Sequence, residues 1–202
     1  GRWWMEDPEP MVSHVFVLGL NSNETDYEII GHVGDIAPDE SIWSARFMGD
    51  KAYIVTFRNI DPLWAIDLSE PANPKVIGEL EIPGVSTYIH PMGDNHLLTI
   101  GIAGDQDGLH WGVTQISIFD VSDFSNPKLA SSLQLNPVSS EDSGWYSYSE
   151  ATYEHKAFQY WEADGLLAVP ISTSRWSEEG YEYISKLQLI NAKPGENLTI
   201  YN

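Results

Sequence analysis

Cysteine is absent from the 202 residues, and basic residues are scarce. Without cysteine the chain forms no disulfide and offers no thiolate for catalysis or metal binding. Lys and Arg number 10 against 30 Asp and Glu, which gives a formal net charge of −20 at pH 7. Such a chain repels nucleic-acid phosphates and anionic membrane surfaces, so we exclude nucleic acid as a partner. We interpret the charge as a solvated surface, with high-salt adaptation or cation binding as alternatives.

Long apolar runs are absent too, since no segment approaches the ~18 residues that a transmembrane helix needs. No signal peptide is visible, so we expect any export signal or membrane anchor to lie in parts of a parent protein outside this chain. The chain is instead rich in aromatic and turn-forming residues, with 8 Trp, 10 Tyr, 16 Gly and 12 Pro. Large rings favour pleated sheets, and Gly and Pro favour turns, so this composition predicts strands joined by turns.

One segment recurs three times, at residues 44–58, 86–100 and 151–171. In each copy a short strand-like run leads into Met-Gly-Asp or Ala-Asp-Gly, and an apolar strand follows. Gly accepts a positive φ and Asp can bond its own backbone, so both tripeptides are signals of a tight turn. Each copy therefore predicts a β-hairpin.

A second segment follows each hairpin, at residues 63–84, 114–135 and 183–201. Each copy has an alternating strand, a polar turn and another short strand. Proline lies in the turn, because it cannot occupy a central strand. Asp67 and Asp120 stand at matching places where the first of these strands ends. We expect each carboxylate to bond the backbone of the turn that follows it.

Together the two segments make a repeat of four short strands, and Asp50 and Asp94 stand 44 residues apart. That period suits one blade of a β-propeller. We predict an all-β fold with about three to four four-stranded antiparallel blades in this chain, as a fragment of a larger propeller or as a ring closed by self-association. The predicted division is the end of a preceding blade at 1–36 and blades at 37–84, 85–136 and 137–202.

Two inserts lengthen the later repeats, at Gly101–Gly112 and Asn136–Glu150. Both are rich in Gly, Ser, Asp and aromatic residues, so we expect surface loops that contact a ligand. Trp111, Trp145 and Tyr146 are the candidate binding residues, because Trp and Tyr beside Ser and Gly are typical of recognition surfaces. The alternative is that these rings pack between blades.

The phrases IFDVSDFSNPK and AIDLSEPANPK, with TYEHKAF and SARFMGDKAYIVTF, resemble secreted bacterial and archaeal proteins that carry a C-terminal β-propeller domain distantly similar to WD40 proteins. The resemblance covers residues 35–202. It implies a propeller on an exported or cell-surface protein and brings no catalytic residues. The third copy reads Gln188-Leu-Ile-Asn191 where the others have Asp-Leu-Ser or Asp-Val-Ser, so we expect that blade to close differently.

An acidic turn suggests a metal site. Asp105 and Asp107 precede Gly108, and such a turn can supply the first oxygen ligands of Ca²⁺, which other loops would complete. Position 12 counted from Asp105 is Ile116 rather than Glu, which excludes an EF-hand. The alternative is a solvated acidic turn. Calcium is the cofactor that the sequence suggests, and a transition-metal site would need the fold to gather scattered histidines.

Three polar residues precede the hairpin turns of successive repeats. Arg46 and His90 lie the same distance before their Gly-Asp turns, and His155 is the nearest counterpart in the third repeat. The first strand of each blade lines the central channel of a propeller, so Arg46, His90 and His155 are candidate binding residues at one channel mouth. In the alternative they bond the backbone of a neighbouring blade. No G-x-S-x-G or H-E-x-x-H motif occurs, and we assign no catalytic residue.

These features favour a non-enzymatic scaffold module of an exported or cell-surface protein that binds a protein, a peptide or a glycan through loops on one face. A hydrolase-like propeller enzyme, completed at the channel mouth by blades outside this chain, is one alternative, and a structural module of a cell envelope is another. The fold alone does not decide, because propellers host many unrelated functions. A funnel around Arg46, His90 and His155 favours the enzyme, and an aromatic patch made by the inserts favours the binding module.

Overall fold

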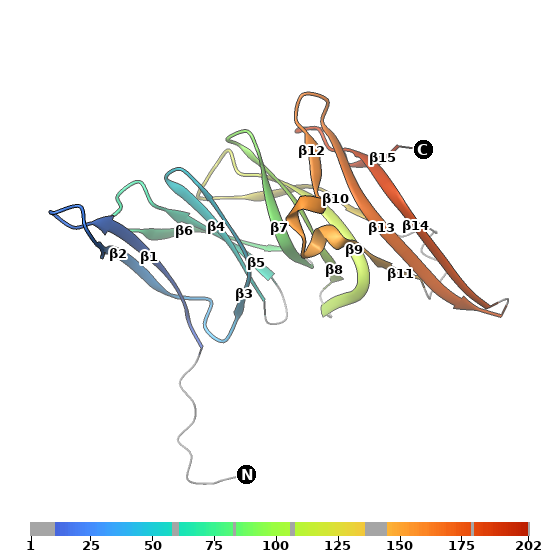
Figure 1. Cartoon of the computed structure of the whole chain (residues 1–202), viewed down its shortest axis with the longest axis horizontal. Helices are drawn as coiled ribbons and strands as arrows, with labels where there is room; N and C mark the ends of the chain where they lie inside the picture. Colours follow the sequence, from blue (N-terminus) through green and yellow to red (C-terminus); the bar gives the residue numbers. More distant parts are fainter. Residues whose placement is uncertain are drawn as a thin grey trace, which may run out of the picture.

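The computed structural model describes residues 11–57, 61–82, 84–105, 108–135, 145–178 and 180–201. These residues form four antiparallel sheets and two short 3-10 turns, η1 (Glu150–Thr152) and η2 (His155–Ala157). The sheets stand side by side in chain order (Figure 1). Within the described ranges, no helix has the length and apolar character needed to cross a membrane.

Each sheet is built from strands that follow one another in the chain. The first sheet contains β1 (Ser13–Leu20) and β2 (Tyr27–Ile36). The second contains β3 (Ser41–Met48), β4 (Lys51–Phe57), β5 (Asp61–Asp67) and β6 (Lys75–Ile82). The third contains β7 (Val85–Met92), β8 (His96–Asp105), β9 (Gly108–Asp120) and β10 (Lys128–Gln134). The fourth contains β11 (Tyr146–Tyr148), β12 (Gln159–Trp161), β13 (Leu166–Ser177), β14 (Gly180–Asn191) and β15 (Thr199–Ile200).

The predicted hairpins are present in the second, third and fourth sheets. Their turns contain Gly49, Gly93 and Gly165, with φ of +61°, +60° and +60°. Glycine adopts this left-handed conformation without the steric cost that a Cβ atom brings. The three turns lie at one end of the sheets, at the upper edge of Figure 1, and we call this the turn end.

The first strand of the fourth sheet is interrupted. β11 pairs with residues 172–174 of β13, whereas β12 pairs with residues 166–168. Between β11 and β12 the chain forms η1 and η2, and the Ser149 hydroxyl fastens this excursion by donating to the carbonyl oxygen of Pro170 at 2.6 Å. His155 consequently lies on a turn beside the sheet and not on a strand.

Apolar side chains fill the space between neighbouring sheets. Because successive side chains of a strand point to opposite faces, adjacent residues such as Leu97 and Leu98 serve different cores. The cores contain Val15, Ile36 and Ile54 between the first two sheets, Tyr53, Leu97 and Phe119 between the second and third, and Leu98, Leu167 and Val169 between the third and fourth. The second and third sheets therefore bury both faces, which explains their nearly continuous apolar strands.

A small residue in the last strand of each sheet makes room for a turn of the next sheet. A Cβ atom on Gly31 of β2 would lie 1.9 Å from a carbonyl oxygen of the turn between β5 and β6. On Gly78 of β6 it would lie 3.0 Å from carbonyl oxygens of the turn between β9 and β10. In β10 the Ser131 hydroxyl instead accepts a hydrogen bond from the amide of Leu198 at 3.0 Å. The same kind of contact thus recurs at all three junctions between the described sheets.

Asp67 and Asp120 make the turn bonds expected of them. Each carboxylate accepts the backbone amide two residues further on, with N–O distances of 2.9 Å. The residues two positions on are Ser69 and Ser122. The hydroxyl and amide of each serine favour the charged form of the carboxylate, so they lower the pKa of Asp67 and of Asp120. The third repeat has Asn191 at this place, and its side chain donates to Glu196 Oε2 at 3.0 Å. This turn is closed through a different partner, as its departure from the repeat predicted.

The prediction of a surface loop at Gly101–Gly112 is wrong. β8 and β9 pair as far as Asp105 opposite Gly108, so most of this insert lengthens a hairpin. Continued backbone hydrogen bonding between the two strands overrides the loop-like composition. Of the insert at Asn136–Glu150, residues 136–144 lie outside the described residues, and Tyr146–Tyr148 form β11.

Candidate functional site

Arg46 lies on β3 and fastens it to β7, the first strand of the next sheet. Its Nε donates to the carbonyl oxygen of Ile89 at 2.8 Å, and its guanidinium lies 5.4 Å from the centroid of the Tyr88 ring. Two residues earlier, the Ser44 hydroxyl donates to the carbonyl oxygen of Ser86 at 2.6 Å. Arg46 therefore bonds the backbone of a neighbouring sheet, which was the alternative to ligand binding. This bond uses the Nε of Arg46 and not its two terminal nitrogens.

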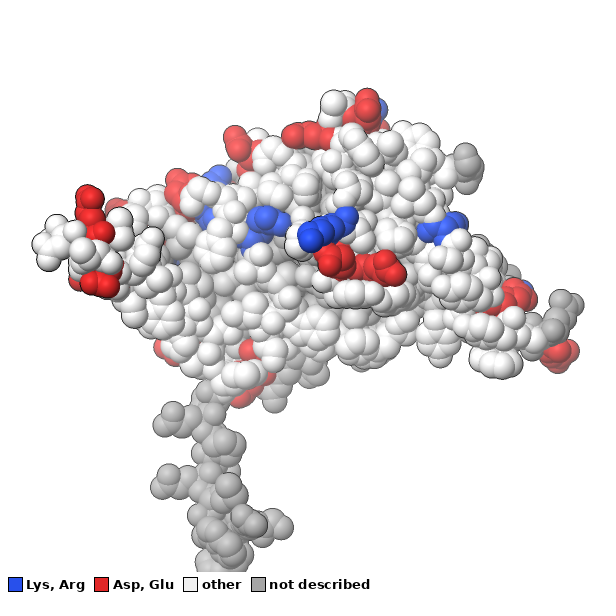
Figure 2. Space-filling view, in the orientation of Figure 1, with Lys and Arg blue, Asp and Glu red and all other residues white. Residues whose placement is uncertain are grey.

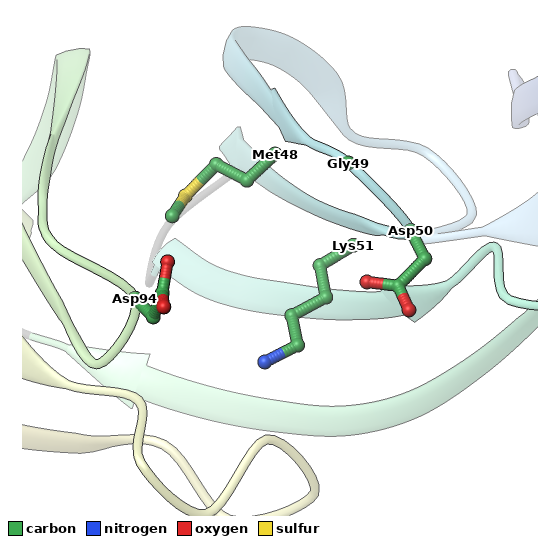
Figure 3. Close-up of a pocket in the computed structure, with 5 residues that line it drawn as sticks. All are labelled: Met48, Gly49, Asp50, Lys51 and Asp94. Carbon is green, nitrogen blue, oxygen red and sulfur yellow. The ribbon is translucent and has the colours of Figure 1, made fainter.

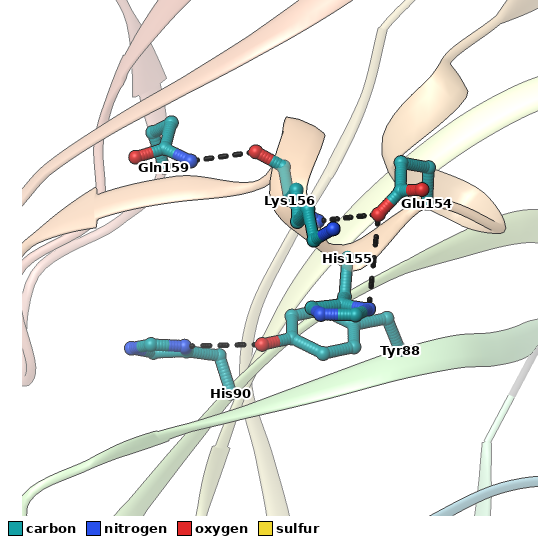
Figure 4. Close-up of polar contacts among 6 residues, drawn as sticks. All are labelled: Tyr88, His90, Glu154, His155, Lys156 and Gln159. Atoms are coloured by element: carbon teal, nitrogen blue, oxygen red, sulfur yellow. Dashed lines mark hydrogen bonds and ion pairs between the residues drawn. The ribbon is translucent and has the colours of Figure 1, made fainter.

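A hollow of about 440 Å³ opens beside Arg46. Its lining consists of Ser44, Ala45, Arg46, Thr87, Tyr88, Ile89 and His155. The rings of His155 and Tyr88 are stacked, with centroids 6.4 Å apart and an angle of 28° between their planes (Figure 4). The structure thus brings Arg46 and His155 to one hollow around Tyr88, a residue that the sequence analysis missed.

His90 does not line this hollow. Its half-buried ring packs against Phe158 and Tyr160, with centroids 5.6 and 5.5 Å away. Burial lowers the pKa of His90, and the positive charge of Arg46 lowers it further, while Glu162 acts in the opposite direction. The ring is therefore neutral near pH 7. η2 and β12 cover His90, whereas the corresponding Arg46 remains at an open surface.

The two histidines are not arranged as a base beside a nucleophile. The Tyr88 hydroxyl lies 3.5 Å from His90 Nδ1, and His155 Nδ1 lies 3.8 Å from Glu154 Oε1 (Figure 4). In the part of the chain that the structure describes, neither ring is hydrogen-bonded to a serine or threonine hydroxyl, the contact that activates such nucleophiles. What the hollow offers is a guanidinium and an imidazole, both of which can donate hydrogen bonds to a ligand.

Charge is spread unevenly over the face that displays β7 and the two 3-10 turns. Lys and Arg side chains form an interrupted row across its middle, and Asp and Glu side chains lie toward the edges and also directly against the middle of the row (Figure 2). In a chain of net charge −20 such a row is the exception.

A second hollow, of about 620 Å³, lies at the turn end. Met48, Gly49, Asp50, Lys51 and Asp94 line it. The two carboxylates lie on opposite sides with the Lys51 amine between them (Figure 3). Lys51 Nζ also lies 5.2 Å from the centroid of the Phe124 ring, a cation–π contact with the neighbouring sheet. The lining is net negative, in contrast to that of the first hollow.

The predicted calcium ligands cannot be assembled into a site. Asp107 lies outside the described residues, and Asp105 is described only by its backbone, as the last residue of β8. Across the described ranges, no three His, Cys, Asp or Glu side chains are grouped so that they could hold a metal ion. Calcium binding by this turn stays a prediction.

Trp111 and Tyr146 lie at the end of the sheets opposite the turns. They belong to β9 and β11 and are 63% and 61% exposed. Tyr146 packs on Gly112, where a Cβ atom would lie 2.3 Å from its ring. Trp43 of β3 lies beside Trp111, with 6.3 Å between ring centroids. We call Trp43, Trp111 and Tyr146 the aromatic end. Trp43 was not predicted as a binding residue, because a single Trp within a strand pattern is as typical of packing as of binding.

Trp145, the remaining aromatic candidate, has a different environment. The Arg175 guanidinium lies 4.7 Å from its ring centroid, and its indole Nε1 is buried without a hydrogen-bond partner among the described residues. Arg175 also donates two hydrogen bonds of 3.0 Å to the Glu182 carboxylate. Trp145 thus packs near the tip of the β13–β14 hairpin, whereas Trp111 and Tyr146 face solvent.

The sheets follow one another in the chain, pack face to face and place their first strands side by side. This arrangement defines the β-propeller class, which the repeats predicted. Residues 3–201 of the chain match the model of a protein family described as the beta propeller domain. The chain belongs to this family.

Two archaeal proteins are similar to this chain in sequence. An uncharacterized protein of Methanocaldococcus jannaschii is 45% identical over 136 residues, which are 67% of this chain and 20% of that protein. An uncharacterized protein of Archaeoglobus fulgidus is 34% identical over 168 residues, which are 83% of this chain and 24% of that protein. The chain therefore spans about a fifth to a quarter of these relatives. Among solved structures, the β-propeller domain of Vanderwaltozyma polyspora Nup133 aligns with a TM-score of 0.43 and 10% identity, over 93% of this chain and 63% of that domain.

Proposed function

We propose that this stretch of propeller is a non-enzymatic binding and scaffold module that takes a protein, peptide or glycan ligand at its aromatic end. The exposure of Trp111 and Tyr146 is the observation that carries the proposal. Single exposed rings are common on protein surfaces, but a contiguous patch of large rings marks an interaction site, and Trp43, Trp111 and Tyr146 form such a patch. Placement on an exported or cell-surface protein is part of the same proposal and is supported by the resemblance of the repeat phrases.

The position of these rings argues against packing between blades as the reason for their exposure. Trp111 belongs to the third sheet and Tyr146 to the fourth, and both sheets are present in the structure. Further blades would pack on the outer faces of the first and fourth sheets, and would leave this junction open. Trp176 and Tyr181 are also exposed, at 79% and 55%, but they lie on the last sheet, where another blade would pack.

The rings of the aromatic end are also held in place. Tyr146 rests on the backbone of Gly112, and the Ser147 hydroxyl accepts the amide of Thr114 at 2.7 Å, which locks β11 to β9. A rigid aromatic side chain loses little conformational entropy when a ligand covers it. The arrangement therefore suits stacking against a sugar ring or an apolar side chain.

An array of immobilised oligosaccharides and peptides tests the proposal. The wild-type chain, the double variant Trp111→Ala/Tyr146→Ala and the control Trp161→Ala are compared. Trp161 is 51% exposed but belongs to β12, beside the turn end. We expect a defined set of ligands that the wild type and the control share and that the double variant loses. Equal loss in both variants, or a full ligand set with the double variant, would contradict the proposal.

A further inference from the structure

Arg46 carries a positive charge that forms no ion pair with an acidic side chain of the described residues. The partners that the structure gives it are the carbonyl oxygen of Ile89 and the ring of Tyr88. Among the described residues it has no carboxylate partner, although acidic residues outnumber basic ones three to one. Arg175 shows the usual outcome, since it holds the Glu182 carboxylate with two hydrogen bonds.

The guanidinium is positioned in advance. Its Nε bond to Ile89 fixes one edge of the group, and its Cζ lies 5.4 Å from the centroid of the Tyr88 ring, a cation–π contact. The two terminal nitrogens form a planar pair of donors that matches the two oxygens of a carboxylate. Because the side chain is already ordered, little conformational entropy is lost when a ligand binds.

The hollow next to this guanidinium suits a small anion. Its volume of about 440 Å³ exceeds that of a single carboxylate group, and none of its lining residues is acidic. His155 contributes an imidazole to the same lining, and its stacking on Tyr88 keeps the ring beside the hollow. Glu154 is the nearest carboxylate to this ring, at 3.8 Å from its Nδ1.

We propose that the hollow between β3 and β7 binds the carboxylate group of a small organic acid, with Arg46 as the bidentate donor and His155 as the second donor. This site lies on the first strands of the sheets, apart from the aromatic end. It is an addition to the proposed function, and either can fail without the other.

Nitrogen-15 NMR titration of the whole chain tests this site. The probes are sodium acetate, sodium glucuronate, glucose and inorganic phosphate at constant ionic strength. We expect acetate and glucuronate to shift the Arg46 side-chain Nε–H resonance saturably, with dissociation constants on the order of millimolar, and glucose to leave it unchanged. Tighter binding of glucuronate than of acetate identifies an acidic sugar as the source of the carboxylate, and equal binding identifies the carboxylate alone.

Variants separate this site from a general effect of charge. Arg46→Lys keeps the charge but removes the planar pair of donors, and we expect it to weaken binding about tenfold, read in all variants from the backbone amide resonances of Thr87, Tyr88 and Ile89. His155→Ala, at an exposed turn, should weaken binding a few-fold without loss of the folded spectrum. Arg175→Lys should leave binding unchanged. No saturable shift, equal binding of glucose, tighter binding of phosphate, or equal loss with Arg175→Lys would overturn the proposal.

Discussion

Side chains at matching places of the repeats differ in their chemistry because their surroundings differ. Arg46 and His90 occupy the same place in two consecutive repeats. Arg46 reaches the backbone of β7 and borders an open hollow, whereas His90 is covered by the rings of Phe158 and Tyr160. The difference comes from the interrupted first strand of the fourth sheet, which brings η2 and β12 over His90.

The burial of His90 predicts a specific dependence of stability on pH. Its pKa is lowered in the folded chain, by burial first and by Arg46 second, although Glu162 opposes the shift. Below about pH 6.5 the unfolded chain takes up a proton at this residue before the folded chain does. The free energy of unfolding of the wild type should therefore fall, relative to that of His90→Phe, as the pH drops from 7.5 toward 5.

Chemical denaturation of both proteins across this range measures the effect. The Phe ring keeps the stacking on Phe158 and Tyr160 but does not titrate. The Tyr88 hydroxyl faces His90 Nδ1 at 3.5 Å. A difference between the two proteins that stays constant with pH, or that grows toward high pH, would contradict a neutral buried His90.

Residues whose partners lie nearby in the chain could be predicted from the sequence. Asp67 and Asp120 bond amides two residues away, so the repeat phrase itself contains both partners. The tie from Arg46 to Ile89 spans 43 residues and depends on how two sheets pack. No local pattern encodes that contact, and for the same reason the role of Tyr88 was missed.

At the scale of elements, turns were predicted better than the lengths of strands. Gly-Asp and Asp-Gly correctly indicate the hairpin turns, because a positive φ is a property of one residue. The segment Gly101–Gly112 has the composition of a loop, yet its backbone continues the pairing of β8 with β9. Strand pairing depends on two segments at once, so the composition of one segment alone predicts a strand that is shorter than the observed one.

The junctions between sheets also depend on a position that the repeats concealed. Gly31, Gly78 and Ser131 receive the turn of the following sheet, but they differ enough that no shared motif was recognised. Their shared requirement is a small side chain, because the neighbouring atoms belong to backbone: carbonyl oxygens beside Gly31 and Gly78, and the Leu198 amide beside Ser131. Only the packed sheets reveal that the three residues have one role.

Gly78→Ala should destabilise the chain through this contact. The added Cβ atom meets carbonyl oxygens of Phe124 and Ser125 at 3.0 Å, and backbone cannot move aside as a side-chain tip can. We expect a loss of about 1–3 kcal/mol in the free energy of unfolding, measured by denaturant titration.

Ala130→Val, at an exposed position of β10, is the matched control and should change stability little. Equal stability of Gly78→Ala and the wild type would show that the junction is loose and that Gly78 does not set the fit between the second and third sheets.

At the scale of the whole molecule, both ends of the row of sheets present apolar faces. On the first sheet Phe16, Leu18 and Leu20 are 53%, 57% and 52% exposed. On the last sheet Tyr183 and Leu187 are 60% and 65% exposed. Propellers bury such faces against further blades, and the archaeal relatives are four to five times as long as the matched part of this chain. We infer that further blades, or a second copy, cover both faces.

Light scattering on the isolated chain tests this inference. We expect the wild type to have a mass above the 22.6 kDa of one chain, because exposed apolar faces associate in water. The double variant Leu18→Glu/Leu187→Glu should move the mass toward one chain. Leu129→Glu, on the outer strand β10 of an internal sheet, should not. A wild type that is monomeric at high concentration would contradict the need for covering partners.

The central claim is that ligands bind at the aromatic end of the propeller. Amide hydrogen exchange of the wild-type chain, with and without a ligand selected on the array, tests it most directly. We expect slower exchange in residues 108–114 and 145–148 and unchanged exchange in the turns at residues 49–51 and 162–166. Slower exchange confined to the turns would contradict the claim and would move the ligand to the opposite end of the sheets.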